Sequence, residues 1–421
     1  MNKKGNSNVL AIAIMFFLFA MISFVTGLQN PMGIIAKAQF GATNLMSQLG
    51  NAANFIAYAF LGLPAGFLLK GKGYKFTALA AVSVGFIGVG ISYLSGVFGS
   101  FPVYLLGAFV SGFSMCMLNT VVNPLLNTLG GGGNKGNQLI QLGGSLNSLA
   151  ATIVPVLAGY LIGEVTEKTQ VADVNLALFI AMAIFALAFV IILFSEIPEP
   201  ELEAAAAAGE QKKENTMSLI KGALSHKNLV FGIIAIFLYV GIEVGIPNFV
   251  NLYMTGALAE GGLGIATAVA GSLVGAYWFL MLCGRLIGGA IGAKVSSKTM
   301  MTVVSAAAIL FLLVGMFMPK TLTVNVLETQ LPVALLFFVL CGLCTSVMWG
   351  AIFNLAVEGL GKYTSIASGL FMVMVCGGGI LPLLQGAVAD AAGFINSYWV
   401  LVAALVYILW FALVGSKPKN A

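Results

Sequence analysis

Residues 176–194 read LALFIAMAIFALAFVIILF, and none of these 19 residues carries a charge or an amide. A helix of about 20 apolar residues is long enough to cross the hydrocarbon core of a bilayer. A stretch with no polar side chain would gain nothing from contact with water. It therefore predicts a helix that spans a membrane.

Similar apolar segments recur along the whole chain of 421 residues, which is 60% hydrophobic and only 8% charged. Soluble domains carry about a quarter charged residues, so a soluble protein is excluded. We predict an all-α membrane protein with twelve transmembrane helices. They are expected at roughly 9–35, 47–69, 76–98, 102–127, 137–163, 175–195, 229–255, 263–291, 299–318, 331–357, 363–388 and 392–415.

The longest polar interruption is residues 196–228, which we interpret as a cytoplasmic linker or short surface helix. It separates an N-terminal six-helix half, residues 1–195, from a C-terminal six-helix half, residues 229–421. The two halves also share a short motif. Ile153–Gly159 reads IVPVLAG, and Ile380–Gly386 reads ILPLLQG at the equivalent place. Parallel repeats of this kind are typical of transporters.

The basic residues predict the orientation of the chain. With both termini in the cytoplasm, 16 of the 19 lysines and arginines lie inside, and Lys37, Lys168 and Lys320 lie outside. Cytoplasmic loops carry an excess of Lys and Arg. The first apolar run is longer than the core of a signal peptide, so we read it as a retained helix. We expect a multi-pass protein of the inner membrane with cytoplasmic termini.

The sequence lacks the residues that most enzymatic mechanisms need. His226 is the only histidine and lies in a polar loop, and the five cysteines lie in apolar segments. The glycine run Gly130–Gly133 with Lys135 lacks the Gly-Lys-Ser/Thr of a phosphate-binding loop, so we predict a tight turn there. A net charge of +5 is too small to indicate nucleic acid. No enzyme, metal or cofactor is expected, apart from a coupling proton or sodium ion.

Uncharged amides are the main polar groups in the predicted helices. The candidate substrate-binding amides are Asn30, Asn51, Asn54, Asn119, Asn123, Asn147, Asn354 and Gln385. Polar groups in a membrane turn toward protein or a wet cavity. Amides both donate and accept hydrogen bonds without a charge, which suits a neutral sugar. The alternative is that they join helices by hydrogen bonds, each contributing about 0.6 kcal/mol.

Two sets of amides are spaced to share a helix face. Asn119, Asn123 and Asn127 are four residues apart, which places them in one stripe along a helix. Asn51 and Asn54 form a shorter stripe. So many amides in helices of both halves exceed what packing requires.

Three other side chains are candidates for function. Glu243 is the only acid deep inside a predicted helix, and a charged carboxyl there costs about 3 kcal/mol. It could bind a proton, sodium or sugar hydroxyls, or make a structural hydrogen bond. Arg285 lies near a cytoplasmic helix end, where we expect a structural or gating role. Trp349 could stack on a sugar ring or pack as an anchor.

Five stretches carry a family resemblance that spans both halves. They are LNTVVNPLLNTLG at 118–130, LNSLAATIVP at 146–155, FLYVGIEV at 237–244, CGRLIG at 283–288 and FNLAVEGLGKYTSIASGL at 353–370. Together they resemble the fucose permease and glucose/galactose permease group of the major facilitator superfamily. The resemblance implies a twelve-helix facilitator fold and symport of monosaccharides, with protons in the fucose permease and sodium in some relatives.

The resemblance also implies roles for single positions. The helix-1 and helix-4 acids of the fucose permease fall on Asn30 and Asn119, which cannot titrate. A polar helix-5 position falls on Gly144. Glu243 falls where the glucose/galactose members also have Glu, which makes it the candidate coupling residue.

We therefore expect a secondary transporter of a neutral sugar, such as a hexose or fucose, that works by alternating access and is coupled to a cation. The alternative is a facilitator-fold exporter or uniporter of another small neutral solute. A membrane enzyme or sensor would need a catalytic constellation or soluble domain, and the sequence contains neither. The expected partners are the sugar and the lipid bilayer, with no nucleic acid, and the protein is expected to be a monomer.

Overall fold

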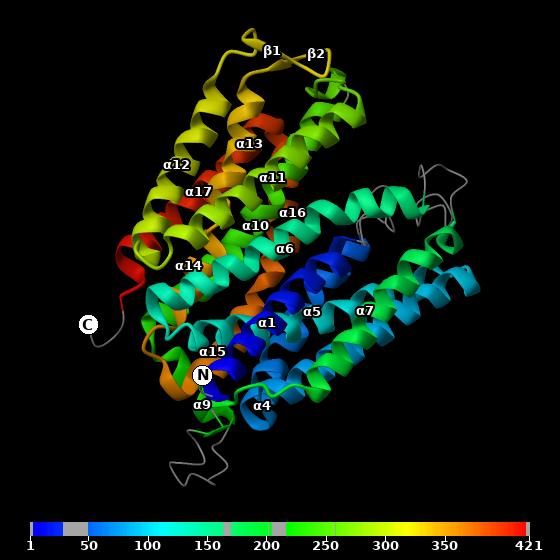
Figure 1. The fold of residues 1–421 in the computed structure, drawn as a ribbon. Coiled ribbons are helices and arrows are strands. Elements are labelled where there is room, and N and C mark those ends of the chain that lie inside the picture. The colour runs from blue at the N-terminus through cyan, green and yellow to red at the C-terminus, as the bar shows by residue number, and fades with distance from the viewer. Residues whose placement is uncertain are drawn as a thin grey trace. The chain divides into compact units, whose positions relative to one another are not determined.

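The computed structural model describes residues 3–27, 49–162, 170–200, 202–203, 216–256 and 258–417. Almost all of this chain is helical (Figure 1). The long helices up to residue 195 are α1 (Lys3–Gly27), α4 (Leu49–Phe98), α5 (Phe101–Leu129), α6 (Gly133–Ile162) and α7 (Asn175–Phe194). The predicted linker contains a short helix, α9 (Thr216–Leu224).

The remaining helices follow the linker. They are α10 (Lys227–Thr255), α11 (Thr267–Ile291), α12 (Ser297–Phe317), α13 (Ala334–Thr345), α14 (Met348–Val357), α15 (Thr364–Val373), α16 (Gly377–Ala392) and α17 (Phe394–Trp410). Single turns of 3₁₀ or π-helix are η1 (Val171–Val174), η2 (Leu258–Glu260), η3 (Gly361–Tyr363), η4 (Met374–Cys376) and η5 (Phe411–Gly415). Two short strands form one hairpin, β1 (Thr323–Val326) and β2 (Thr329–Pro332).

The helices match the twelve predicted segments. Ten helices of the described chain are long and apolar enough to cross a membrane. One of these, Ala52–Phe98, is 47 residues long and contains a break, so it covers two predicted segments. The helix α6 covers residues 137–162 of the predicted segment 137–163. The twelve-helix prediction is therefore confirmed.

The break in α4 lies at Gly73, whose φ of 82° ends one helix before the next begins. Glycine adopts this backbone conformation without steric cost. The freed N–H groups of Tyr74 and Lys75 donate to the carboxylate of Glu199, at 2.6 and 2.8 Å. Burial raises the pKa of the Glu199 carboxyl, and these two hydrogen bonds oppose the shift. A residue of the predicted linker thus caps the second half of α4.

Two predicted segments begin a few residues before their helices do. The segment predicted at 331–357 begins as strand β2, and its helix starts only at Ala334. The strand β1 alternates between exposed and partly buried residues, and Leu327 and Glu328 form the turn with positive φ (Figure 1, top). The segment predicted at 263–291 starts at Thr267, because Leu263 and Ile265 instead donate backbone hydrogen bonds to the end of α10.

The predicted helix 331–357 is also not continuous. A turn at Ser346 and Val347 separates α13 from α14. Side chains from two other helices bind the carbonyl groups at this break. Arg285 Nε donates to the Ser346 carbonyl at 3.3 Å, and Gln141 Nε2 donates to the Val347 carbonyl at 2.8 Å. Irregular backbone in a membrane protein requires such partners.

The chain forms two compact units. The first comprises Met1–Gly132, Leu146–Ser225 and Gly359–Cys376, and the second comprises Gly133–Ser145, His226–Glu358 and Gly377–Ala421. Each unit therefore combines segments from both halves of the sequence. The pseudo-repeat of residues 1–195 and 229–421 stays a prediction.

Small residues allow a segment of the second half to pack in the first unit. There α15 lies against α4, with Gly369 beside Gly62 and Gly66. A β-carbon on Gly66 would come within 2.8 Å of the Ser365 carbonyl oxygen, closer than side chains pack. The two backbones can approach this closely only because glycine has no side chain.

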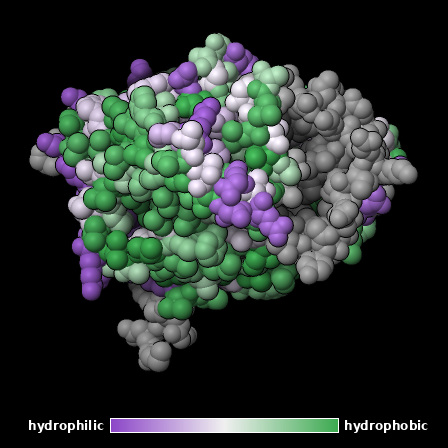
Figure 2. Space-filling view, turned by 90° about the horizontal axis from the view of Figure 1, so that it is seen from above, coloured by the Kyte–Doolittle hydropathy of each residue, from purple (hydrophilic) through white to green (hydrophobic). Residues whose placement is uncertain are grey.

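Apolar side chains cover much of the described surface. Figure 2 shows hydrophobic residues over most of the face in view, with hydrophilic residues in scattered groups. Phe194, Phe317 and Phe98 are 82%, 72% and 68% exposed. Exposed apolar area on this scale is typical of a surface that contacts lipid.

Candidate functional site

In the first unit, two predicted amides of α5 form a connected cluster with Tyr58 of α4. Asn119 donates through Nδ2 to the Tyr58 hydroxyl and to the Met115 carbonyl, both at 3.1 Å. Asn123 donates to the Asn119 carbonyl at 2.8 Å. All three polar side chains are buried. Asn119 and Asn123, two of the three amides in the predicted stripe, are therefore hydrogen-bonded in a row on one face of α5.

Asn54 belongs to the same pair of helices. It lies one turn before Tyr58 on α4, and its backbone packs against Gly112 of α5. The side chain is 4% exposed, and its Nδ2 has no hydrogen-bond partner among the described residues. A buried amide without a partner costs about 1–3 kcal/mol. An unsatisfied donor beside a row of amides is what a hydroxyl-binding site needs before its ligand arrives.

The other predicted residues of this unit have different outcomes. Asn147 of α6 donates to the Phe19 carbonyl of α1 at 2.9 Å, a contact that joins two helices. Asn30 lies outside the described residues. The side chain of Asn51 is also outside them, although its backbone lies in α4.

In the second unit, Glu243 and Arg285 form an ion pair. Arg285 Nη2 lies 3.2 Å from Glu243 Oε1, and the two side chains are only 10% and 15% exposed. The Arg285 guanidinium also donates to the carbonyl of Gly144 at 3.1 Å, besides that of Ser346. Arg285 therefore connects α11 with α10, α6 and the break between α13 and α14.

Two tyrosines complete the surroundings of the acid. The Tyr239 hydroxyl donates to Glu243 Oε1 at 2.9 Å. The Tyr277 hydroxyl lies 3.3 Å from the Glu243 carbonyl and 3.0 Å from the Thr345 hydroxyl. The Glu243 carboxylate thus has the Arg285 guanidinium and the Tyr239 hydroxyl as its partners. The positive and negative charges of this cluster cancel.

The predicted aromatic contact, Trp349, lies beside this cluster. Its ring meets the Tyr239 ring edge to face, with centroids 6.3 Å apart, and the side chain is only partly buried. An aromatic face that is not fully covered can pack against the apolar face of a sugar ring.

Asn354 and Gln385 contact other parts of the second unit. Asn354 donates to the Ser297 hydroxyl at the start of α12, at 2.9 Å. Gln385 is fully buried, and its Nε2 lies 3.4 Å from the Ser397 hydroxyl of α17. Its Oε1 has no partner among the described residues. Substrate binding by these two amides stays a prediction.

Sequence reasoning missed several members of the acid cluster. Tyr239 stands four residues before Glu243, a spacing that puts both on one helix face and could have been noticed. Tyr277 and the Gly144 carbonyl give no local signal, because they meet Glu243 or Arg285 only through the fold. The family position on Gly144 thus contributes a backbone carbonyl instead of a side chain.

The model of one protein family matches residues 12–381, which is most of the chain, and that family is the Major Facilitator Superfamily. The chain belongs to this superfamily. Membership confirms the prediction of a multi-pass transporter fold and places the chain among transporters, which are not enzymes.

Relatives of known name align over nearly the whole chain. A glucose/galactose transporter of Brucella abortus is 29% identical over 410 residues, 97% of this chain and 94% of the relative. The L-fucose-proton symporter of Escherichia coli is 22% identical over 438 residues, 99% of this chain and 95% of the relative. A solved structure of the E. coli fucose:proton symporter FucP has a TM-score of 0.82 at 20% identity, covering 98% of this chain and 100% of FucP. It supports the fold.

Proposed function

We propose that this protein is a secondary transporter that moves a neutral monosaccharide across the inner membrane by alternating access. The observation that carries the proposal is the buried, uncharged cluster of Asn54, Tyr58, Asn119 and Asn123, which can exchange hydrogen bonds with hydroxyl groups. The buried charges of Glu243 and Arg285 neutralise each other, so this pair carries no net charge that would select an ionic substrate. The relatives named as hexose and fucose transporters agree with this chemistry.

We propose Glu243 as the coupling residue and the proton as the coupling ion. A sodium ion at this carboxylate would lie next to the Arg285 guanidinium, which already occupies Oε1 at 3.2 Å. Like charges at such a distance repel each other strongly in a poorly hydrated site. A proton, by contrast, neutralises Glu243 and releases Arg285 without adding a second cation to the cluster.

Uniport is the second candidate, and a specific observation favours it. Asn30 and Asn119 replace the acids of the fucose permease, and Glu243 is held in an ion pair. If the pair never opens, sugar would move down its own gradient with no ion. Transport without coupling would use the same amide cluster, so only a gradient experiment separates the two.

The proposal is tested by uptake into proteoliposomes. Labelled glucose, galactose and fucose are offered with an imposed proton gradient, an imposed sodium gradient or no gradient. Accumulation of one of these sugars with the proton gradient alone is expected. Equilibration without accumulation would establish uniport, and no uptake of any sugar would overturn the proposed function.

The variant Glu243→Gln tests the coupling residue. It mimics the protonated acid, so it should abolish accumulation and leave exchange of sugar across the membrane intact, because exchange needs no net ion movement. Glu358→Gln is a matched control, since Glu358 contacts neither Arg285 nor Tyr239 in the described structure. Wild-type accumulation by Glu243→Gln would show that Glu243 is structural.

We also propose that both termini and the linker 196–228 face the cytoplasm and that the protein acts as a monomer. The distribution of lysine and arginine supports the orientation. Cysteines introduced at Gln170 and Gln211 should react oppositely with an impermeant thiol reagent on intact cells. Labelling at position 211 from outside would reverse the topology.

A further inference from the structure

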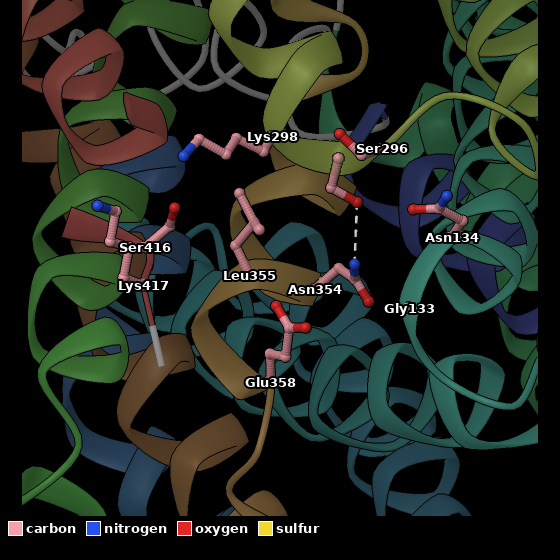
Figure 3. A pocket seen from close by; sticks show the side chains of 10 residues that line it. Gly133, Asn134, Ser296, Lys298, Asn354, Leu355, Glu358, Ser416 and Lys417 are labelled. Carbon is pink, nitrogen blue, oxygen red and sulfur yellow. Dashed lines mark hydrogen bonds between the residues drawn. The ribbon is translucent and has the colours of Figure 1, made fainter. Parts of the chain in front are cut away.

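A cavity of about 310 Å³ lies within the second unit, away from the Glu243–Arg285 pair (Figure 3). The start of α6, the start of α12, the end of α14 and the residues after α17 line it. Small-molecule sites in proteins have volumes of about 300 Å³ and more. The charge distribution predicts that this face is cytoplasmic, because Lys298 and Lys417 belong to segments assigned to the inside.

The cavity is positively charged. Lys298 and Lys417 line it together with one acid, Glu358. None of these three side chains has an ion-pair partner within the part of the chain that the structure describes. Lys298 also lies in the first turn of α12, which contains no acid, and a helix N-terminus is already positive. An anion would relieve this accumulation of positive charge.

The same wall of the cavity contains hydrogen-bond donors that have no acceptor among the described residues. The Ser297 side chain is only 2% exposed, and its hydroxyl accepts a hydrogen bond from Asn354, so its own hydrogen is left to donate. Figure 3 shows Asn354 at the wall of the cavity, with this hydrogen bond drawn as a dashed line. The N–H groups of Ser297 and Lys298 have no acceptor among the described residues, whereas that of Thr299 is satisfied by Ser296. The oxygen atoms of a phosphate readily accept hydrogen bonds from hydroxyl and N–H groups of this kind.

Other lining groups suit hydroxyls. Glu358 carries an unpaired carboxylate, which would repel an anion at close range but accepts hydrogen bonds from alcohols. Asn134 contributes an amide on the α6 side of the cavity, well separated from Lys298 in Figure 3. The site therefore combines a cationic end for a phosphate with a second end for hydroxyl groups.

We propose that this cavity binds a hydroxyl-bearing phosphate ester, with its phosphate at Lys298, Lys417 and the start of α12 and its hydroxyls at Glu358 and Asn134. Two sources share this chemistry: a soluble sugar phosphate and the glycerol phosphate headgroup of a lipid. None of the residues that line this cavity belongs to the cluster of Asn54, Tyr58, Asn119 and Asn123, so the proposal stands whether or not the protein carries a sugar.

The test is calorimetric titration of the full chain in nanodiscs of phosphatidylcholine. Glucose 6-phosphate and inorganic phosphate are titrated separately, each with excess glucose present so that a transport site is already filled. We expect glucose 6-phosphate to bind more tightly than inorganic phosphate. Lys298→Gln should weaken its binding at least about tenfold, since a hydrogen bond to a charged group contributes that much or more.

Three further variants sharpen the result. Lys298→Gln with Lys417→Gln should abolish binding. Glu358→Gln should reduce the preference for the sugar phosphate over inorganic phosphate without weakening inorganic phosphate. Lys294→Gln removes a lysine that does not line the cavity, so it should leave both affinities unchanged. Unaltered melting temperatures exclude unfolding as the cause.

A second arm distinguishes the two sources. In nanodiscs that contain phosphatidylglycerol, native mass spectrometry should show lipid retained by the wild type and lost from the double lysine variant if the headgroup is the ligand. Binding of glucose 6-phosphate in the first arm identifies the soluble ester instead. Failure of both compounds to bind, equal affinity for inorganic phosphate, or binding that survives the double lysine variant would overturn the proposal.

Discussion

Replacing Arg285 by Met removes the positive charge beside Glu243 and keeps an extended side chain of similar length. The wild-type guanidinium pairs with Glu243 at 3.2 Å and donates to the carbonyls of Gly144 and Ser346. In the variant Arg285→Met, all three acceptors lose a donor. Glu243 keeps only the hydrogen bond from Tyr239.

The expected loss of stability depends on which hydrogen-bond partners each acceptor keeps in the variant. Removing one partner of a buried ion pair destabilises a protein by about 3–5 kcal/mol, because the remaining charge is buried alone. The hydrogen bonds that the two carbonyl groups lose account for about 1–2 kcal/mol of this total, because the carbonyls can hydrogen-bond water or a neighbouring N–H instead. In the double variant with Glu243→Gln, no charge is left unpaired. Only the carbonyl loss remains, about 1–2 kcal/mol.

The assay is unfolding of the purified protein in detergent, followed by tryptophan fluorescence. Arg285→Met alone should lower the free energy of unfolding by about 3–5 kcal/mol. Adding Glu243→Gln should restore about 2–3 kcal/mol of it, the difference between the two estimates. Lys294→Met serves as the control for loss of a cation near the same helix end, with a change below about 0.5 kcal/mol. If the double variant is no more stable than Arg285→Met, the ion pair does not stabilise Glu243 as described.

Two further variants test other contacts. Asn119→Leu should weaken sugar binding by about 1–3 kcal/mol, roughly five- to a hundredfold, because it leaves a sugar hydroxyl and the Tyr58 hydroxyl without a partner. Equilibrium binding of labelled sugar measures the effect, with the exposed Asn396→Leu as the control. Unchanged affinity would show that the amide row serves helix packing. Glu199→Ala should lower the free energy of unfolding by about 1–2 kcal/mol, as expected for loss of a helix cap. Glu203→Ala changes an exposed neighbouring position and should leave the free energy of unfolding unchanged. Equal effects of the two variants would refute the capping role.

The helices could be predicted because each apolar segment carries its own signal. The stretch 176–194 is helical within one residue of its predicted range of 175–195. The amide row on α5 followed from a spacing of four residues, which is a local property of a helix. Helix starts were less certain where apolar residues continue past the helix, as at Leu331 in strand β2.

Long-range contacts could not be predicted. Glu243 and Arg285 are 42 residues apart, and no local pattern indicates that one pairs with the other. Arg285 was placed near a helix end on its position alone, although six residues still separate it from the end of α11. The turn at Ser346 interrupts an apolar run without proline or asparagine to mark it. Its carbonyl partners come from other helices, so only the fold reveals them.

The break between α13 and α14 has a mechanical consequence. A continuous helix resists bending because several backbone hydrogen bonds must stretch together. At this turn the Ser346 carbonyl accepts a hydrogen bond from the Arg285 side chain, and the Val347 carbonyl accepts one from the Gln141 side chain as well as one from the backbone N–H of Ala351. The contacts at this turn come partly from side chains of other helices, so we expect α14, which carries Trp349, to bend more readily here than within a continuous helix. Protonation of Glu243 would weaken its ion pair with Arg285 and so make bending at the turn of Ser346 and Val347 easier.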